Sequence, residues 1–264
     1  MNRLTLHTGR TMPVLGLGTW QLTRDTAGTV EEALRLGYRM IDTSGDYGTQ
    51  PGIGEAIRRS GLERDELFLV TKVEEDEDAY EATGRNLHEL GLEYADLMLV
   101  HRPPPTGAGR GLWEGLIQAR DEGRARDIGV SNYSAEQIDE LVEVTGEVPV
   151  VNQIEWSPFG WSPEMLEFCH GRGIVIQAYS PLTRTRRLDD PALASIAADS
   201  HKTPAQLLIR WNIELGVAPL PKANDPAHLA ENLDVFDFEL DDSRLAELAE
   251  LNEHYSSLGV LPYV

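Results

Sequence analysis

Cysteine is almost absent from this chain of 264 residues, because Cys169 is the only one. A single cysteine cannot form an internal disulfide, so the sequence carries no sign of an oxidising compartment. No apolar run approaches the roughly 18 residues of a membrane-spanning helix, and residues 1–10 lack the apolar core of a secretory signal. These absences predict a cytoplasmic protein that does not enter a membrane.

Lysine is also scarce, since only Lys72, Lys202 and Lys222 occur among 23 basic residues, whereas 44 residues are acidic. The formal net charge is therefore −21. Such a field repels phosphate backbones and anionic lipid surfaces, so we expect neither nucleic acid nor a membrane as a partner. The excess of carboxylates indicates adaptation to high salt, with an ordinary acidic bacterial enzyme as the alternative.

Short aliphatic runs alternate with amphipathic stretches of about 10–15 residues along the whole chain. The strand-like runs are residues 14–18, 39–42, 67–73, 96–100, 127–130, 148–153, 174–178 and 217–220, and the helix-like segments are residues 26–36, 52–60, 78–91, 111–122, 135–145, 163–171, 203–214 and 226–233. The alternation predicts a single α/β domain over residues 1–264, a (β/α)8 TIM barrel. A hairpin over residues 4–12 precedes the barrel, and an extra helix over residues 241–251 follows it.

Polar and ionisable residues follow three consecutive predicted strands. Asp42 and Tyr47 come after the second strand, Lys72 lies near the end of the third, and His101 comes just after the fourth. Each residue alone has an ordinary structural explanation, such as a helix cap or a solvated side chain. Because active sites of closed parallel barrels lie at the carboxyl ends of the strands, we expect the four side chains to converge in one cleft.

This cluster suits the protonation of a carbonyl oxygen. A tyrosine has an ordinary pKa of about 10 and is a reluctant acid at neutral pH. A Lys72 cation nearby favours the phenolate and lowers that pKa, and Asp42 holds the lysine as its counter-ion. His101 can donate to, or orient, the oxygen that is protonated. The cluster offers no hydride, so a reduction needs a cofactor.

Eight sequence blocks extend the pattern along the chain. They are Gly16-Leu-Gly-Thr-Trp20, Ile41-Asp-Thr-Ser-Gly-Asp-Tyr-Gly48, Val70-Thr-Lys72, Leu97-Met-Leu-Val-His-Arg-Pro103, Ile128-Gly-Val-Ser-Asn132, Val151-Asn-Gln153, Ala178-Tyr-Ser-Pro-Leu182, and Leu220-Pro-Lys222 followed by Ala230-Glu-Asn232. In their order, one at each barrel position, the blocks resemble those of the aldo-keto reductase family. The resemblance implies a monomeric, metal-free barrel that reduces an aldehyde or ketone with NAD(P)H.

The resemblance also implies roles for individual residues. Asp42, Tyr47, Lys72 and His101 match the catalytic tetrad, with Tyr47 as general acid. Ser131, Asn132 and Gln153 match the groups that hold the nicotinamide carboxamide, and Tyr179 matches the aromatic that stacks on the ring. Thr19, Trp20, Ser180 and Leu182 resemble further cofactor or pocket contacts, and Glu231 and Asn232 resemble adenine contacts. Trp20, Tyr47, His101 and Arg102 are the side chains expected to face the substrate.

Cofactor choice depends on residues 222–228. Family members that prefer NADP hold its 2′-phosphate with a lysine, an adjacent hydroxyl residue and an arginine six positions after the lysine. Only Lys222 matches, since Ala223 has no hydroxyl and His228 is mostly neutral above an ordinary pKa of about 6.5. Asp225 adds a like charge, although the following helix N-terminus favours a phosphate. We expect a weak preference for NADPH, with usable NADH activity.

Three departures from the family pattern concern the rim of the site. Gly48-Thr-Gln-Pro51 replaces the usual Gly-Asn-Glu and changes the start of the next helix. Arg102 replaces a tryptophan that commonly follows the tetrad histidine, so a cation replaces one aromatic wall, and the prolines at 103–105 stiffen that loop. Only residues 255–264 remain to cover the pocket, so we expect few or no specificity contacts from this tail.

Other interpretations stay open. Gly16-x-Gly18 lacks the third glycine of a dinucleotide-binding fingerprint, and Tyr179 could be a core aromatic. A Schiff-base aldolase could use Lys72 as nucleophile and Tyr47 as proton shuttle, although Asp42 would keep the amine charged. The third possibility is a redox sensor that binds the cofactor without turnover.

Overall fold

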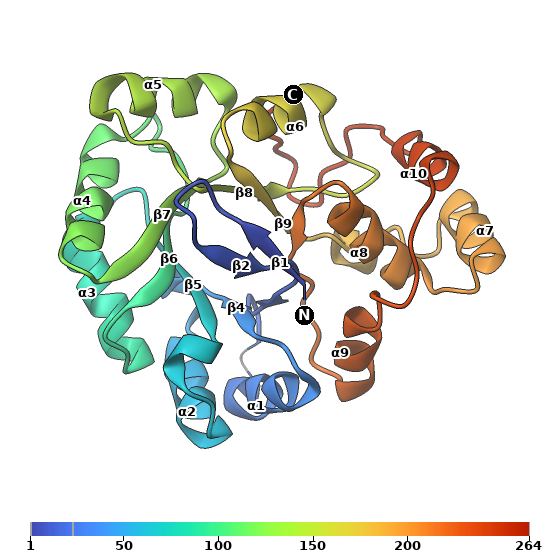
Figure 1. Cartoon of the computed structure of the whole chain (residues 1–264), viewed down its shortest axis with the longest axis horizontal. Coiled ribbons are helices and arrows are strands. Elements are labelled where there is room, and N and C mark those ends of the chain that lie inside the picture. The colour runs from blue at the N-terminus through green and yellow to red at the C-terminus, as the bar shows by residue number, and fades with distance from the viewer. Residues whose placement is uncertain (1, 23, 264) are drawn as a thin grey trace.

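The computed structural model describes residues 2–22 and 24–263, in which a ring of parallel strands is surrounded by helices (Figure 1). The strands of the ring are β3 (Leu17–Gly18), β4 (Met40–Asp42), β5 (Phe68–Val73), β6 (Ala95–Val100), β7 (Ala125–Ser131), β8 (Val151–Glu155), β9 (Val175–Tyr179) and β10 (Ala218–Pro219). Neighbours in the chain are neighbours in the sheet, from β3 to β10. Each strand overlaps one predicted run, so the predicted (β/α)8 barrel is confirmed.

The first and last strands of the ring also meet. The amide of Gly16 donates to the carbonyl of Pro219, and the amide of Gly18 donates to the carbonyl of Pro221, each at 3.1 Å. A Cβ atom on Gly18 would lie 2.8 Å from the carbonyl oxygen of Leu220. The two glycines therefore allow β3 and β10 to approach closely and close the barrel.

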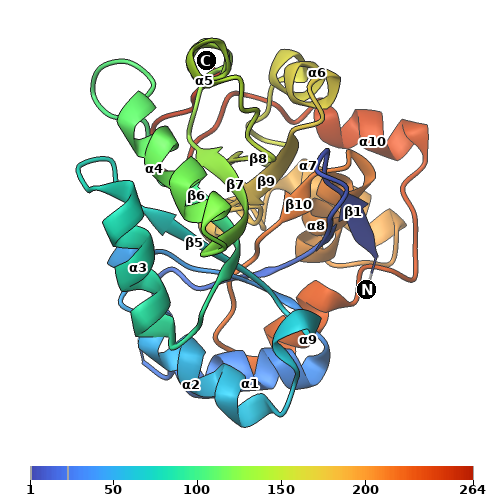
Figure 2. The same ribbon diagram turned by 60° about the vertical axis from the view of Figure 1, so that its left-hand side comes forward.

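Helices cover the outside of the ring, and every predicted helix is present. They are α1 (Thr26–Leu36), α2 (Gln50–Ser60), α3 (Ala79–Leu90), α4 (Arg110–Asp121), α5 (Ala135–Thr145), α6 (Pro163–Gly171), α7 (Pro191–Asp199), α8 (Pro204–Glu214), α9 (Pro226–Leu233) and α10 (Asp242–Ala249). Figure 2 shows α3 and α4 outside β5, β6 and β7. Among the described residues, no helix is long and apolar enough to cross a membrane.

Helix α7 is an addition that the sequence analysis missed. It lies between β9 and α8, where the eightfold pattern predicts a single helix. The sequence nevertheless contains a signal for the start of this helix, the pair Asp190-Pro191. In the structure the Asp190 carboxylate accepts from the amide of Ala192 at 3.0 Å, and Pro191 occupies the first turn. An acidic N-cap followed by proline is a typical helix start.

The predicted hairpin, β1 (Arg3–Thr5) with β2 (Thr11–Pro13), lies across the amino-terminal end of the barrel (Figure 1). Leu6 and Met12 are buried there, and the amide nitrogen of Gln177 lies 3.1 Å from the Met12 sulfur. The hydroxyl of Thr8 donates to Asp127, near the start of β7, at 2.9 Å. Because the hairpin closes this end, the opposite end of the strands remains for a site.

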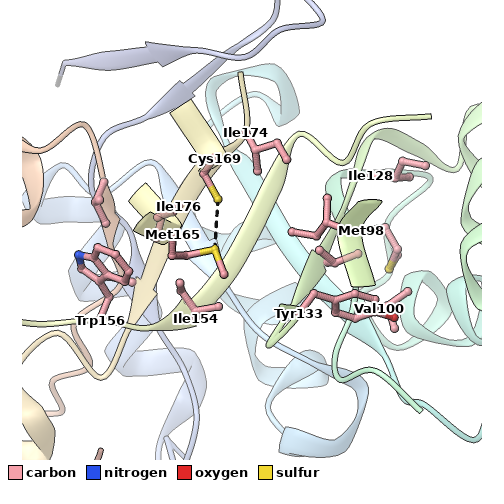
Figure 3. Packing of buried hydrophobic residues seen from close by; sticks show 14 of the residues in the cluster. Met98, Val100, Ile128, Tyr133, Ile154, Trp156, Met165, Cys169, Ile174 and Ile176 are labelled. Atoms are coloured by element: carbon pink, nitrogen blue, oxygen red, sulfur yellow. Dashed lines mark hydrogen bonds between the residues drawn. The ribbon is translucent and has the colours of Figure 1, made fainter. Parts of the chain in front are cut away.

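A large apolar core fills the space between strands and helices on the β6 to β9 side (Figure 3). Cys169 lies inside it, with its sulfur 3.7 Å from that of Met165. Burial raises the pKa of the Cys169 thiol to about 12. The thiol is therefore protonated at neutral pH and serves as a small apolar side chain.

Candidate active site

A cavity of about 1070 Å³ lies at the carboxyl ends of the strands. Its wall contains most of the residues that the sequence singled out, namely Thr19, Trp20, Asp42, Tyr47, His101, Arg102, Ser131, Asn132, Gln153, Tyr179, Ser180, Leu182 and Lys222. Four predicted residues do not line the cavity: Lys72 is buried against Asp42, and His228, Glu231 and Asn232 lie on α9. Together with Lys72 on β5, the predicted residues of the wall come from all eight strands of the ring or from the loops that follow them.

Lys72, on β5, is fully buried. Its ammonium group donates to the two oxygens of Asp42, at 2.8 and 3.0 Å, and to the carbonyl of Thr43 at 2.7 Å. Burial lowers the pKa of Lys72, but Asp42 and Tyr47 together outweigh it, and the net pKa lies above the ordinary value. Lys72 is therefore a cation in a fixed position.

Tyr47 ends a short 3-10 helix, η1 (Gly45–Tyr47), that follows β4. The Lys72 ammonium lies 5.0 Å from the centre of the tyrosine ring, and the His101 ring lies 5.8 Å away at 71°. Burial raises the pKa of Tyr47 and the Lys72 cation lowers it, with a net rise above the ordinary value. The lowering expected from Lys72 is present, but the expected net decrease is not, because burial outweighs it.

Glu74 is a neighbour of His101 that the sequence analysis did not identify. Its Oε1 lies 2.6 Å from His101 Nδ1 and accepts a 3.0 Å hydrogen bond from the Ser44 hydroxyl. The backbone amide of His101 donates to Val73 at 2.9 Å, which places the residues after β5 and β6 side by side. Side chains alternate along a strand, so Glu74 shares the side of Lys72, and this signal was readable in the sequence.

Arg102 lines the cavity, where its guanidinium forms ion pairs with two carboxylates. Its guanidinium lies 3.5 Å from a carboxylate oxygen of Glu74 and 3.5 Å from one of Glu75. The side chain that stands in place of the family's tryptophan is thus an arginine paired with two glutamates.

Asp46, Glu74 and His101 also bring one potential metal-ligating atom each within 4.8 Å of one another. The 2.6 Å separation of His101 Nδ1 and Glu74 Oε1 is a hydrogen-bond distance. Two ligands of one metal ion, each about 2 Å from it, lie farther apart in tetrahedral geometry. We therefore assign this contact as a hydrogen bond.

Ser131, Asn132, Gln153 and Tyr179 form a connected polar group on the β7 to β9 side of the cavity. Gln153 Nε2 donates to Asp42 Oδ1 at 2.7 Å, and the Ser131 hydroxyl donates to the carbonyl of Gln153 at 2.8 Å. The Tyr179 hydroxyl donates to the amide oxygen of Asn132 at 2.8 Å. Asn132 has a φ of 64°, a left-handed conformation that asparagine adopts more readily than most residues. Hydrogen bonds therefore link this group to Asp42 and hold it rigid.

The loops after β3 and β9 form the adjoining wall. The hydroxyl of Thr19 donates to the carbonyl of Asp42 at 2.8 Å, so it supports the end of β4. Trp20 is 39% exposed, and the guanidinium of Arg184 lies 4.2 Å from its ring centre. Arg184, which the sequence analysis did not single out, thus joins the two loops across the cavity. Arg184 and its two neighbours, Thr183 and Thr185, have positive φ angles, and this left-handed conformation makes the loop turn sharply.

Lys222 lies on the rim after β10, where it is exposed and forms no ion pair with any residue that the structure describes. Ala223, next to it, is buried and offers no polar group. Helix α9 begins directly after Asp225, whose carboxylate accepts from the amide of Ala227 at 2.7 Å. A carboxylate of the chain therefore already occupies the helix N-terminus that we expected to attract a phosphate.

The carboxyl-terminal tail, from which we expected few or no specificity contacts, contributes three residues to the cavity wall. Leu258, Val260 and Pro262 all line the wall. The tail is anchored by Glu155, at the end of β8, whose carboxylate accepts from the Ser256 hydroxyl at 2.7 Å and from the next backbone amide at 2.8 Å. This buried anchor brings even a short tail over the site.

Comparisons with known proteins agree with this architecture. The model of the Aldo/keto reductase family matches residues 14–253. An aldo-keto reductase of Mycobacterium tuberculosis is 44% identical over 95% of this chain and 91% of its own length, and one of Mycolicibacterium smegmatis is 42% identical over 94% and 93%.

Two solved structures are similar throughout. An aldo/keto reductase from Brucella melitensis is 39% identical, with a TM-score of 0.90 over 95% of this chain and 99% of that one. A Bombyx mori aldo-keto reductase in complex with NADP is 34% identical, with a TM-score of 0.91 over 97% and 94%. Family model, sequence relatives and fold agree, and the chain belongs to the aldo/keto reductase family of oxidoreductases.

Proposed function

We propose that this chain reduces the carbonyl group of an aldehyde or ketone with NAD(P)H, reversibly and without a metal, with Tyr47 as general acid. The observation that carries the proposal is the buried ion pair of Lys72 and Asp42 behind the Tyr47 phenol. Asp42 keeps Lys72 charged, so a cation lies beside a proton donor in the wall of a large cavity. Such an arrangement serves proton transfer to a carbonyl oxygen.

The cavity wall fits a nicotinamide cofactor. Ser131, Asn132 and Gln153 bear the hydroxyl and amide groups that pair with a carboxamide, and Tyr179 adds an aromatic face beside them. The volume of about 1070 Å³ lies at the upper end of the range for ligand and cofactor pockets, about 300–1,000 Å³, so the cavity is large enough for a cofactor. Lys222 on the rim is a free cation for a phosphate. The NADP complex of the Bombyx mori relative supports the same cofactor class.

The cofactor, when bound, supplies a hydride for the carbonyl carbon. The Tyr47 hydroxyl gives its proton to the carbonyl oxygen, and the Lys72 cation stabilises the phenolate that remains. His101 lines the same part of the cavity and donates a hydrogen bond to that oxygen, which aligns the carbonyl for attack. Reduction thus yields an alcohol, and in the reverse direction the phenolate accepts the proton.

The aldolase alternative requires Lys72 as a neutral amine, because only the unprotonated form attacks a carbonyl. Here the ammonium donates to three oxygens, and the net pKa of Lys72 is raised. The geometry therefore favours Lys72 as an electrostatic group and disfavours a Schiff base.

A panel of aldehydes, ketones and sugars, each with NADPH and with NADH, tests the proposal through the absorbance of the reduced nicotinamide. We expect turnover of at least one aldehyde. Cofactor binding by fluorescence without any turnover would instead identify a redox sensor. Borohydride trapping of a substrate adduct on Lys72 would identify an aldolase.

A further inference from the structure

The two ring nitrogens of His101 have different surroundings. Nδ1 faces Glu74 Oε1 at 2.6 Å and the Ser44 oxygen at 3.4 Å. The ring also meets Tyr47 edge to face and lines the cavity. The His101 and Glu74 side chains are only 8% and 17% exposed, so neither has much freedom to turn.

The proton count at this contact follows from the charge of Glu74. Burial raises the pKa of Glu74. The hydrogen bonds from His101 and Ser44 and the nearby positive charges lower it by more, so the net pKa lies below its ordinary value. Glu74 is thus an ionised acceptor at neutral pH, and the Ser44 hydroxyl already donates to the same oxygen. The nitrogen facing a carboxylate must carry a proton, so Nδ1 of His101 is protonated.

This tautomer limits what His101 can do for a substrate. Neutral histidine carries one ring proton, so a ring protonated at Nδ1 has only a lone pair at Nε2. Such a ring accepts a hydrogen bond but cannot donate one to a carbonyl oxygen. Only the doubly protonated imidazolium donates through Nε2 while Nδ1 remains bonded to Glu74.

We propose that Glu74 is a positioning residue that fixes the Nδ1–H tautomer of His101 and stabilises its imidazolium form for carbonyl reduction. The inference rests on the proposed reductase function. Tyr47 still supplies the proton that the carbonyl oxygen gains, while His101 donates a hydrogen bond and keeps both ring protons. The site thus has two cations next to the ring of Tyr47, Lys72 and His101.

Three other charged or titratable groups lie close to His101 or to its partner Glu74. Asp46, on η1, lies 3.8 Å from Nδ1, beyond hydrogen-bond range, and its side chain is 41% exposed. Tyr47 contacts the ring by its edge, and Arg102 lies 3.5 Å from the second oxygen of Glu74. Arg102 therefore helps to keep Glu74 ionised, and within the described ranges Glu74 is the carboxylate that bonds Nδ1.

The pH profile of reduction tests this assignment through Glu74→Gln, with Glu75→Gln as matched control. Glu75 also lies 3.5 Å from Arg102 and its variant loses the same charge, but it makes no contact with His101. In Glu74→Gln we expect the alkaline limb of kcat to move to lower pH by about one unit, because an amide stabilises the imidazolium less than a carboxylate does.

At pH values above the limb this shift lowers kcat about tenfold, and activity recovers toward acid pH with the cofactor KM unchanged. Glu75→Gln keeps the wild-type profile. An equal loss of kcat at every pH in Glu74→Gln would mean a purely structural role, and a shift of the same size in Glu75→Gln would mean a general charge effect; either overturns the proposal.

Nitrogen NMR of the His101 ring separates this inference from the reductase function. We expect Nδ1 of the wild-type ring to stay protonated on both sides of the alkaline limb, with Nε2 as the nitrogen that loses its proton there. A neutral ring protonated at Nε2 would overturn the proposal even in an active enzyme. A chain with the Nδ1–H tautomer but no turnover supports the positioning by Glu74 and contradicts the reductase function.

Discussion

At the scale of single residues, the behaviour of Tyr47 follows from two opposing influences. Burial raises the pKa of its phenol, and the Lys72 cation lowers it, with burial the larger. The phenol is therefore protonated throughout the neutral range, which is the form that an acid needs. Asp42 serves this balance indirectly, because it holds Lys72 as a cation.

Tyr47→Phe is expected to lower kcat for carbonyl reduction at least about 100-fold, because only the proton donor is lost. The affinity for the cofactor should stay nearly unchanged, since the ring remains. Steady-state kinetics and fluorescence titration measure the two quantities separately. Retention of more than about a tenth of kcat would refute the role of Tyr47 as acid.

Lys72→Met is expected to lower activity and to move the pH profile of alcohol oxidation upward. Oxidation requires the phenolate of Tyr47, which forms only above the pKa of the phenol. Removal of the cation that lowers this pKa pushes phenolate formation to higher pH. An oxidation profile that stays in place would contradict the pairing of Lys72 with Tyr47.

At the scale of elements, we expect the start of α9 to influence the choice between NADPH and NADH. Lys222 precedes the helix as a free cation on the rim, whereas the Asp225 carboxylate caps its N-terminus. The first favours a 2′-phosphate and the second opposes it, so we expect NADPH to be preferred only weakly over NADH.

Two substitutions separate these influences. Lys222→Ala should raise the KM for NADPH far more than that for NADH, because only NADPH carries the 2′-phosphate. Asp225→Asn keeps a capping side chain and removes its charge, so it should lower the KM for NADPH selectively. Steady-state kinetics with both cofactors measure these changes. Equal effects of Lys222→Ala on both would show that the lysine does not contact the phosphate.

Barrel closure is a second property of elements, and it depends on Gly16, just before β3, and on Gly18 within it. Gly18→Ala brings a Cβ within 2.8 Å of the Leu220 carbonyl oxygen, so we expect a loss of about 1–3 kcal/mol in the free energy of unfolding. Gly111→Ala, on α4, is the control, because nothing lies within 4 Å of the added atom. Denaturant unfolding compares the two, and equal stability would contradict the role of Gly18.

At the scale of the whole molecule, the main property is the large excess of negative charge. The net charge is −21, and many described ion pairs join exposed side chains, such as Arg59 with Glu55 and Arg110 with Glu114. Exposed pairs contribute only about 0–1 kcal/mol each. They therefore offset little of the repulsion among the other carboxylates. Salt screens this repulsion, so we expect it to raise the stability of the folded chain.

The melting temperature is expected to rise steeply between about 0.1 and 3 M KCl, because the Debye length falls from about 10 Å to below 3 Å over that range. Calorimetry or circular dichroism at each salt concentration measures the rise. A flat curve would indicate an ordinary acidic enzyme and would refute adaptation to high salt.

Much of this molecule is determined by local sequence. The alternation of apolar runs and amphipathic segments predicts the barrel, because strand and helix periods are properties of neighbouring residues. The order of the strands then brings Asp42, Lys72 and His101 to one end, since parallel strands share a direction. Helix α7 shows the limit of this argument, because an eightfold pattern leaves no place for an additional helix.

Only the tertiary structure decided how these residues act on one another. The net pKa of Tyr47 depends on the depth of the cavity wall, and the pairing of Glu74 with His101 depends on the alignment of two strand ends. The contribution of the tail depends on Glu155, about a hundred residues earlier in the chain. Burial and distance between remote segments set these energies, and neither is a property of a local run of residues.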